Sequence, residues 1–221
     1  MATRPLVSIV TRTKDRTVLL DRALKDCAKQ TMRDFELIVV NDGGDPAPVD
    51  ALLEKHASLL QGRARVIHNE TSQGVERASN IAIESSTGRY ICIHDDDDTW
   101  SPLFLERASN FLDEHPGYGG VAVRTEIVLE KIEGQTVTEL GREIAWPDVK
   151  QFSLSRLMSS NIAVPISCMY PRSVIDELGG FRDDLPVVGD SAPSSKVRCG
   201  LHRWAAVGLL ASAPIPSWCI G

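Results

Sequence analysis

Short apolar, β-branched runs alternate with amphipathic stretches over the first 115 residues of the chain. The strand-like runs cover 6–11, 35–40, 65–68 and 89–94. Apolar residues at helical spacing follow each of them, near 20–28, 52–60, 75–86 and 102–115. A strand, a helix and a further strand in one sheet form a parallel unit, so this repetition predicts an α/β domain with a mostly parallel, doubly wound central sheet flanked by helices.

After residue 116 the regular alternation of strand-like and helix-like stretches ends. A strand is expected at 120–124, a β-hairpin at 127–140 with Glu133-Gly134 at its turn, and another strand at 166–170. A helix then begins at Pro171 and ends at Gly179-Gly180. We therefore predict a single domain over 1–190, made of halves 1–115 and 116–190. The composition shifts after Asp190, and the atypical tail 191–221 contains no acidic residue.

Bulk composition excludes several classes of protein. The formal net charge of −6 argues against a nucleic-acid partner, which normally requires a basic face. The five cysteines are widely spaced without a CxxC pair, which argues against a zinc site or a disulfide framework and suits a reducing cytoplasm. The longest apolar stretch, 204–215, is about half of the roughly 20 residues that span a bilayer, so we expect no transmembrane segment.

Three polar clusters follow predicted strands, at 11–16, 41–44 and 95–98. Ligands of parallel α/β sheets bind at the carboxyl ends of the strands, so these clusters are the candidate site. Neither GxGxxG after the first strand nor GxxxxGK[ST] is present, which disfavours nicotinamide, flavin and P-loop proteins. A phosphate group bound here would need a partner other than a glycine-rich cradle.

The adjacent carboxylates of Asp95, Asp96, Asp97 and Asp98 can supply that partner. Carboxylates crowded at a strand end repel one another unless a cation neutralises them. Mg²⁺ or Mn²⁺ takes one or two carboxylates and completes its shell with phosphate oxygens and water. Residues two apart in an extended chain point the same way, so Asp95 and Asp97 would face the ligand while Asp96 and Asp98 turn elsewhere. The alternative is a solvated acidic loop or favourable charge before a helix.

Two further residues have competing interpretations. Asp42, which ends the second strand in a Gly-bounded turn, could contact a ligand or only bond its own backbone. His94 could ligate a metal, but no second histidine lies nearby, and a strand-end histidine packed against its neighbours is the favoured interpretation.

Several motifs together resemble family 2 glycosyltransferases, which have the GT-A fold. They are Val-Ser-Ile-Val-Thr-Arg-Thr-Lys-Asp-Arg, Phe-Glu-Leu-Ile-Val-Val-Asn-Asp-Gly-Gly, Gly-Val-Glu-Arg-Ala-Ser-Asn and His-Asp-Asp-Asp-Asp, in this order. Gly179-Gly180-Phe181 followed by Gly189-Asp190 is similar to the acceptor-side motif of that family. The resemblance covers roughly residues 5 to 190, and the ordered set is far more specific than any one motif.

The resemblance implies sugar transfer, with inversion, from a nucleoside-diphosphate sugar to a carbohydrate or glycoconjugate hydroxyl. UDP is the leading donor nucleotide, Mn²⁺ or Mg²⁺ the cofactor, and 1–115 and 116–190 are the nucleotide-binding and acceptor-side halves. The enzyme would act in the cytoplasm, at the inner face of the membrane, in polysaccharide or glycoconjugate biosynthesis. The implied donor-binding residues are Thr11, Arg12, Thr13, Asp42, Asp95 and Asp96. Asp97, with Asp95, would hold the metal as a DXD motif, and Asp190 would be the general base.

The chain also departs from the family pattern. The first loop, usually Pro-Thr-Tyr-Asn, is Arg12-Thr13-Lys14-Asp15 here, and an arginine common before the asparagine of the third motif is Ser79. After Asp190 the usual aromatic residue and amphipathic helix are replaced by the tail. One alternative function is therefore a nucleotide-sugar-binding remnant with little turnover. A sugar nucleotidyltransferase is disfavoured, because segment 12–16 has no glycine.

Overall fold

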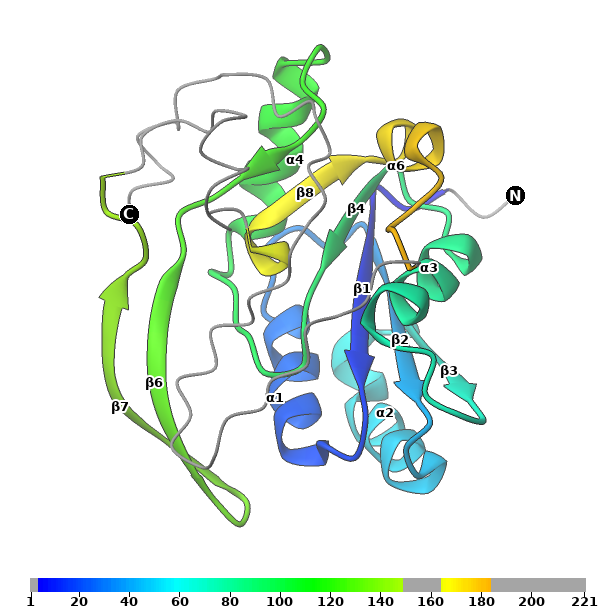
Figure 1. Ribbon diagram of the computed structural model, residues 1–221, viewed down its shortest axis with the longest axis vertical. Helices are drawn as coiled ribbons and strands as arrows, with labels where there is room; N and C mark the ends of the chain where they lie inside the picture. Colours follow the sequence, from blue (N-terminus) through cyan, green and yellow to red (C-terminus); the bar gives the residue numbers. More distant parts are fainter. Residues whose placement is uncertain (1–3, 149–163, 184–221) are drawn as a thin grey trace.

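The computed structural model describes residues 4–148 and 164–183 (Figure 1). The first half contains β1 (Val7–Thr13), α1 (Thr17–Ala28), β2 (Phe35–Asp42), α2 (Pro46–Leu60), β3 (Ala64–Asn69), α3 (Val75–Ser85), β4 (Tyr90–Ile93) and α4 (Phe104–Glu114). The second half contains β5 (Val121–Ala122), β6 (Glu126–Glu133), β7 (Thr136–Ile144), a 3₁₀ turn (Pro165–Ser167), β8 (Cys168–Pro171) and α6 (Arg172–Leu178).

Six strands form the central sheet in the order β3-β2-β1-β4-β8-β5. The first four are parallel, whereas β8 pairs antiparallel with both β4 and β5. The chain moves from β1 outward to β3 and then returns to the other side of β1 with β4. This reversal beside β1 creates a switch point, where α/β sheets bind ligands. The predicted mostly parallel α/β fold is confirmed.

The sheet is covered on both faces because its strands are apolar on both faces. Val7 and Ile9 of β1 pack in one core with residues of α1, α2 and α4. Val10, which follows Ile9 and points to the opposite face of the sheet, packs in the other core with residues of α3 and α6. Figure 1 shows α1 and α2 side by side, with α3 near the opposite ends of β1 and β2 in the view. The central strands are thus fully buried, and only their ends reach solvent.

The hairpin β6–β7 stands apart from the central sheet and runs along one edge of the molecule (Figure 1). Its two strands pair antiparallel, and Gly134 in the turn has a φ of 59°. The predicted hairpin is confirmed, but it is longer than 127–140 at both ends. Within the described residues, no helix combines the length and apolar character needed to cross a bilayer.

Two boundaries differ from expectation. β1 continues through Thr13, so Arg12 lies in a strand and not in the predicted loop, because the whole of β1 pairs with β2 as far as Thr13–Asn41. β5 is shorter than 120–124 and contains only Val121 and Ala122. Asp190, the end of the predicted domain and the tail 191–221 lie outside the described residues.

Candidate functional site

The carboxyl ends of β1, β2 and β4 lie together at one edge of the sheet. β1 is hydrogen-bonded to β2 on one side and to β4 on the other, with Val10 opposite Ile93 and Thr13 opposite Asn41. The three polar clusters predicted from the sequence therefore meet here. An ion pair between Arg12 and Asp95 joins the end of β1 directly to the segment after β4.

Of the four aspartates after β4, Asp96 is buried and the other three are partly exposed. The side chains of Asp95 and Asp97 are 17% and 33% exposed, whereas that of Asp96 is fully buried. Burial raises the pKa of Asp96 to about 6, although the Arg16 charge opposes the rise. Burial, together with the charges of Asp95 and Asp97, raises the pKa of Asp98 to about 7. Asp95 and Asp97 are thus the pair on the outer side of the segment.

Three arginines, from β1, from the residue before α1 and from α1 itself, hold the aspartate segment. Arg12 pairs with Asp95, and Arg16 lies 3.1 Å from Asp97 Oδ2. Arg16 also forms an ion pair with the buried Asp96, at 2.5 Å from its Oδ1. Arg22 donates to the carbonyl oxygen of Asp97 at 2.5 Å and pairs with Glu130 of β6 at 2.6 Å. The guanidinium groups offset the repulsion among the aspartates.

Arg12 also reaches the first turns of α3. Its Nη1 donates to the carbonyl oxygen of Val75 at 3.3 Å and to the Ser79 hydroxyl at 3.1 Å. Ser79 is the position at which the family resemblance would have an arginine. The structure places the guanidinium group of Arg12 against this serine, so a positive charge is present beside α3 although it comes from β1.

Asp42, at the end of β2, binds the segment that leads into α3. Its carboxylate accepts hydrogen bonds from Asn69 Nδ2 (2.7 Å), Ser72 Oγ (2.7 Å) and the backbone N–H groups of Gln73 (2.8 Å) and Gly74 (3.1 Å). Burial favours the neutral acid, but these donors outweigh it and lower the pKa of Asp42. The carboxylate is therefore ionised and already has protein donors on both oxygens.

Gly43 permits this close packing. It has a φ of 80°, and a Cβ atom there would lie 2.5 Å from the backbone nitrogen of Ser72. A residue with a side chain would push the 71–74 segment away from Asp42.

His94 is fully buried and faces α1 instead of the aspartate side chains. Its Nε2 lies 2.9 Å from Asp26 Oδ2, and its Nδ1 lies 2.9 Å from the carbonyl oxygen of Asp95. The packed interpretation of His94 is confirmed. Asp26 and Trp100 were not among the predicted site residues. A buried histidine at a strand end needs a polar partner, and this requirement could have pointed to Asp26.

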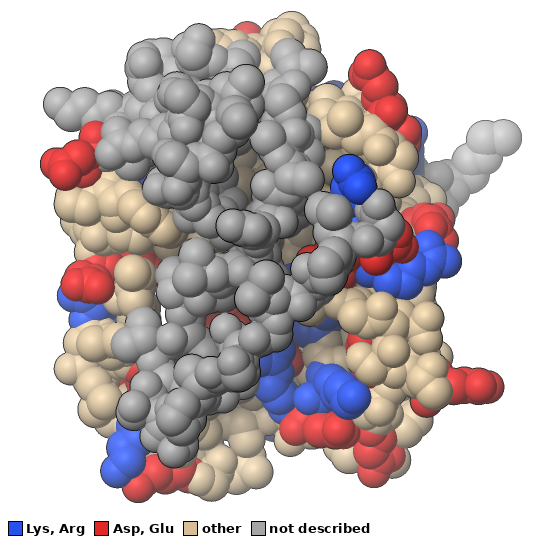
Figure 2. All heavy atoms as spheres, in the orientation of Figure 1, with Lys and Arg blue, Asp and Glu red and all other residues tan. Residues whose placement is uncertain are grey.

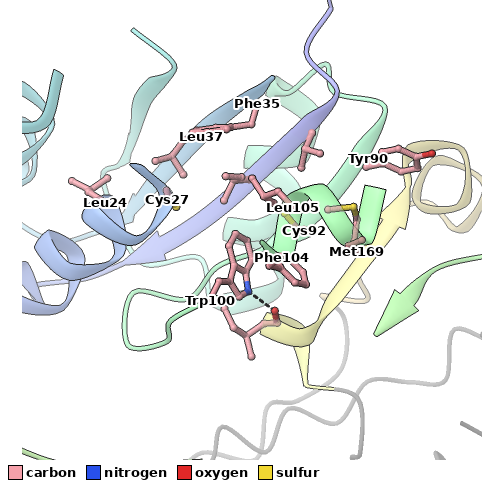
Figure 3. Close-up of a cluster of buried hydrophobic side chains, with 14 of the residues drawn as sticks. Leu24, Cys27, Phe35, Leu37, Tyr90, Cys92, Trp100, Phe104, Leu105 and Met169 are labelled. Carbon is pink, nitrogen blue, oxygen red and sulfur yellow. Dashed lines mark hydrogen bonds between the residues drawn. The ribbon is translucent and has the colours of Figure 1, made fainter. Parts of the chain in front are cut away.

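Trp100 closes the far end of the aspartate segment. Its backbone N–H donates to Asp26 Oδ2 at 2.7 Å, and its indole Nε1 donates to the carbonyl oxygen of Ile166 at 2.6 Å (Figure 3). Figure 3 also shows Trp100 beside Phe104, with Leu105 and Cys92 in the same cluster. The segment that carries the aspartates thus begins and ends in the core.

A second link joins α3 to the segment after α6. The side-chain amide of Asn80 donates to the carbonyl oxygen of Phe181 and accepts from its N–H, both at 2.8 Å. Gly180 has a φ of 88°, and a Cβ atom there would lie 2.7 Å from Asn80 Oδ1. Two motifs that are 101 residues apart are therefore in direct contact.

A separate hollow of about 490 Å³ lies between α1, α2 and the tip of the β6–β7 hairpin. Its lining includes Asp21, Lys25 and Lys55 but none of the strand-end residues. Burial favours neutral Asp21, yet hydrogen bonds from Lys25, Lys55 and His56 prevail and hold its pKa below the usual range. Basic and acidic side chains also lie next to each other in the lower middle of the face in Figure 2. The lining holds three basic side chains, those of Arg22, Lys25 and Lys55, against the one carboxylate of Asp21, so the hollow is net positive.

Comparisons with known proteins agree with this arrangement. Residues 8–179 match the family model described as glycosyl transferase family 2. The chain is 28% identical over 180 residues to the uncharacterized glycosyltransferase YwdF of Bacillus subtilis, which covers 81% of this chain and 63% of that protein. Across three curated relatives, the chain spans between 39% and 63% of their length.

Two solved structures share the fold. One is the mannosyltransferase PcManGT from Pyrobaculum calidifontis in complex with GDP-Man and Mn²⁺, with a TM-score of 0.61 and 21% identity. The other is S. aureus TarS 1-349 in complex with UDP, with a TM-score of 0.64 and 19% identity. The matches cover 83% of this chain in both cases, and 49% and 52% of those chains. The central sheet with its flanking helices and separate hairpin is thus a GT-A-type fold.

Proposed function

Because the chain belongs to glycosyl transferase family 2, we propose that it transfers a sugar from a nucleoside-diphosphate sugar to a hydroxyl group of a carbohydrate or glycoconjugate, with inversion at the anomeric carbon. The main support for the proposal is that three polar clusters lie together at one edge of the sheet, namely Thr11–Thr13, Asp42 and Asp95–Asp98. In the two solved structures with the same fold, the bound nucleotides are GDP-Man and UDP.

The proposed donor-binding residues are Thr11, Arg12, Thr13, Asp42, Asp95 and Asp96. Thr11 Oγ1 is buried and has no hydrogen-bond partner among the described residues, and Thr13 lies in the same strand. Arg12 supplies a positive charge between α3 and Asp95, suited to the diphosphate. Asp96 is buried, so its contribution to the donor site comes through its charge, which lies against Arg16.

The outer carboxylates of Asp95 and Asp97 fit a divalent cation, Mn²⁺ or Mg²⁺. Both are partly exposed oxygen donors, and Asp97 is paired with an arginine that is itself about one-third exposed. Within residues 4–148 and 164–183, no group of three or more His, Cys, Asp or Glu side chains could hold a metal ion. When bound, the cation would stabilise negative charge on the leaving diphosphate.

Asp190 is the proposed general base, which takes the proton of the attacking acceptor hydroxyl. An inverting transfer requires this group on the opposite side of the sugar from the leaving diphosphate. A later part of the chain must supply it, since β1, β2 and β4 supply the donor side. Asn80 holds Phe181, which precedes Asp190 by nine residues, against α3 of the donor half.

We propose a cytoplasmic setting at the inner face of the membrane. Cys27, Cys92 and Cys168 are free, buried thiols, which suits a reducing compartment.

The test of the proposed function is a calorimetric titration with nucleoside diphosphates and their sugars, each with and without Mn²⁺, followed by an assay for release of the nucleoside diphosphate. We expect Mn²⁺-dependent binding and slow or acceptor-stimulated release. Absence of any nucleotide binding, with or without Mn²⁺, would overturn the proposal.

In that titration we expect UDP, GDP and dTDP to bind more tightly than ADP and CDP, with UDP the leading donor nucleotide. The Asp42 carboxylate can accept the imide N–H of uracil or thymine or the N1–H of guanine, whereas adenine and cytosine offer no ring N–H there. A base would have to displace one of the present donors, and the Ser72 hydroxyl is the most easily rotated.

The Asp42→Asn variant distinguishes a base contact from a structural role. If Asp42 contacts the base, the ratio of UDP to CDP affinity should fall toward one, because an amide can also donate to cytosine. An equal loss for all nucleotides would instead mean that Asp42 only holds segment 71–74, and equal or tighter binding of ADP by the unaltered protein would remove it from this role.

Arg16 competes with a cation for Asp97 in the proposed site, since its guanidinium group occupies Asp97 Oδ2. The Arg16→Gln variant should therefore bind Mn²⁺ about 2- to 5-fold more tightly without nucleotide, the size expected for a partly exposed ion pair. Titration of Mn²⁺ into the nucleotide-free protein measures this change. Arg63→Gln is the matched control, because it removes the same charge at the other end of the sheet. Unchanged or weaker affinity in Arg16→Gln would contradict the competition.

A further inference from the structure

Asp26, a residue of α1, joins both ends of the segment that carries the four aspartates. The same oxygen, Oδ2, lies 2.9 Å from His94 Nε2 and accepts the Trp100 N–H at 2.7 Å. His94 immediately precedes the aspartates and Trp100 follows them after a single threonine. One buried carboxylate oxygen therefore sets the distance between the two ends of segment 94–100.

The ring of His94 transmits this contact toward the metal-site residues. It is fully buried, and its Nδ1 lies 2.9 Å from the backbone oxygen of Asp95. The Trp100 ring meets it edge-on, with centroids 4.4 Å apart, and stacks on Phe104 at the same distance. The ring cannot shift without disturbing the aromatic cluster, so Asp26 and the backbone of Asp95 are held in a fixed relation.

Gln30, two residues past the end of α1, extends the same attachment. Its side chain donates to the carbonyl oxygen of Ser101 at 3.0 Å and accepts the Leu105 N–H at 3.2 Å. Gln30 is almost fully buried. Asp26 and Gln30 together therefore hold the His94 side chain on one side of the aspartates and the backbone at 100, 101 and 105 on the other.

We propose that Asp26 is a positioning residue for the donor and metal site, although it does not contact the exposed carboxylates of Asp95 and Asp97. Four adjacent carboxylates repel one another and would spread the segment that bears them. By binding both His94 and Trp100, the shared oxygen of Asp26 holds the two ends of segment 94–100 together and keeps Asp95 and Asp97 on its outer side. The proposal rests on the proposed function for its ligand, and its test therefore includes a readout that needs no ligand.

The decisive variant is Asp26→Asn, with Asp26→Ala as a second. The asparagine keeps the shape of the side chain but removes its charge, so the hydrogen bonds to His94 and Trp100 weaken. We expect UDP affinity in the presence of Mn²⁺ to fall about 10- to 100-fold, as for other residues that orient metal ligands. Amide hydrogen exchange at 95–100 should become faster, while exchange in β1 and β2 stays unchanged.

Glu36→Gln is the matched control. Glu36 is also a largely buried carboxylate that joins separate segments, but at the opposite end of the sheet, where it accepts from the N–H groups of Thr87 (2.5 Å) and Gly88 (3.1 Å). Thermal unfolding of both variants measures their general destabilisation. Glu36→Gln should leave the affinity for UDP and Mn²⁺ unchanged at a similar loss of stability.

Two results would overturn the positioning role. One is an affinity loss in both variants that follows their loss of stability; the other is unchanged exchange at 95–100 in the Asp26 variants. If Asp26→Ala does not fold, Asp26→Asn decides. If the unaltered protein binds no nucleotide with Mn²⁺, the proposed function fails, and the exchange measurement still decides whether Asp26 closes the segment.

Discussion

Replacing Asp97 by alanine is expected to lower UDP affinity in the presence of Mn²⁺ by more than about 100-fold, since even residues that only orient metal ligands contribute about 10- to 100-fold. Asp97 has the more exposed side chain of the two proposed metal ligands. A bound cation would take the place of the Arg16 guanidinium group beside its carboxylate. Calorimetric titration of UDP with Mn²⁺ and with EDTA measures the effect. The unaltered protein should lose affinity in EDTA to a similar extent.

Asp98→Asn is the matched control for Asp97→Ala. Asp98 belongs to the same acidic run, but its raised pKa reflects burial, and the sequence analysis predicts that it turns away from the ligand. The Asp98→Asn substitution should therefore lower UDP affinity less than Asp97→Ala does.

Metal and diphosphate bind as a unit in the proposed site, so UDP should strengthen Mn²⁺ binding by the same factor as Mn²⁺ strengthens UDP binding. Equal UDP affinity in EDTA and in Mn²⁺ would rule out the metal at Asp97.

Asp190→Asn is expected to reduce sugar transfer by at least about 100-fold, the usual effect of losing a general base. Donor and metal binding should stay intact, because the residues that supply them lie on β1, β2 and the segment after β4. The measurement is the release of nucleoside diphosphate in the presence of acceptor, alongside calorimetry of donor binding. The amide cannot take a proton from the acceptor hydroxyl, which is the reason for the loss.

Asp183→Asn tests whether the effect is specific to Asp190. Asp183 lies closer to the Gly179-Gly180-Phe181 motif and is exposed, so its loss should change transfer little. Full transfer in Asp190→Asn would assign the base to another residue. A loss of donor binding in that variant would instead mean that Asp190 supports the donor site.

The order of the elements was predictable because each depends on local patterns of apolar residues, glycine and proline. The position of β8 was not, since nothing in Cys168–Pro171 indicates that it inserts antiparallel between β4 and β5. Similarly, the pairing of β1 through Thr13 depends on Asn41 in another strand. Long-range pairing follows from how the whole sheet assembles, and a local pattern contains little of that information.

The same division applies to the candidate site. Extended geometry predicts that Asp95 and Asp97 lie on one side of the chain and Asp96 on the other, and the exposures of these side chains agree. The attachment of Arg16 and Asp26 was not predictable, because each depends on a helix that packs against the end of a distant strand. The donors around Asp42 likewise come from residues 69–74, which no pattern near Asp42 identifies.

The contacts between the arginines and the aspartates join residues that are 75 to 83 positions apart in the chain. β2 and β3 lie on one side of β1, whereas β4, which leads into the aspartates, lies on the other side. Contacts of such long sequence separation form late, after the entropy of closing the intervening chain has been overcome. Nucleotide binding by this protein should therefore require that β4 has joined the sheet. A folding intermediate in which only the elements from β1 to β3 are formed should not bind the donor.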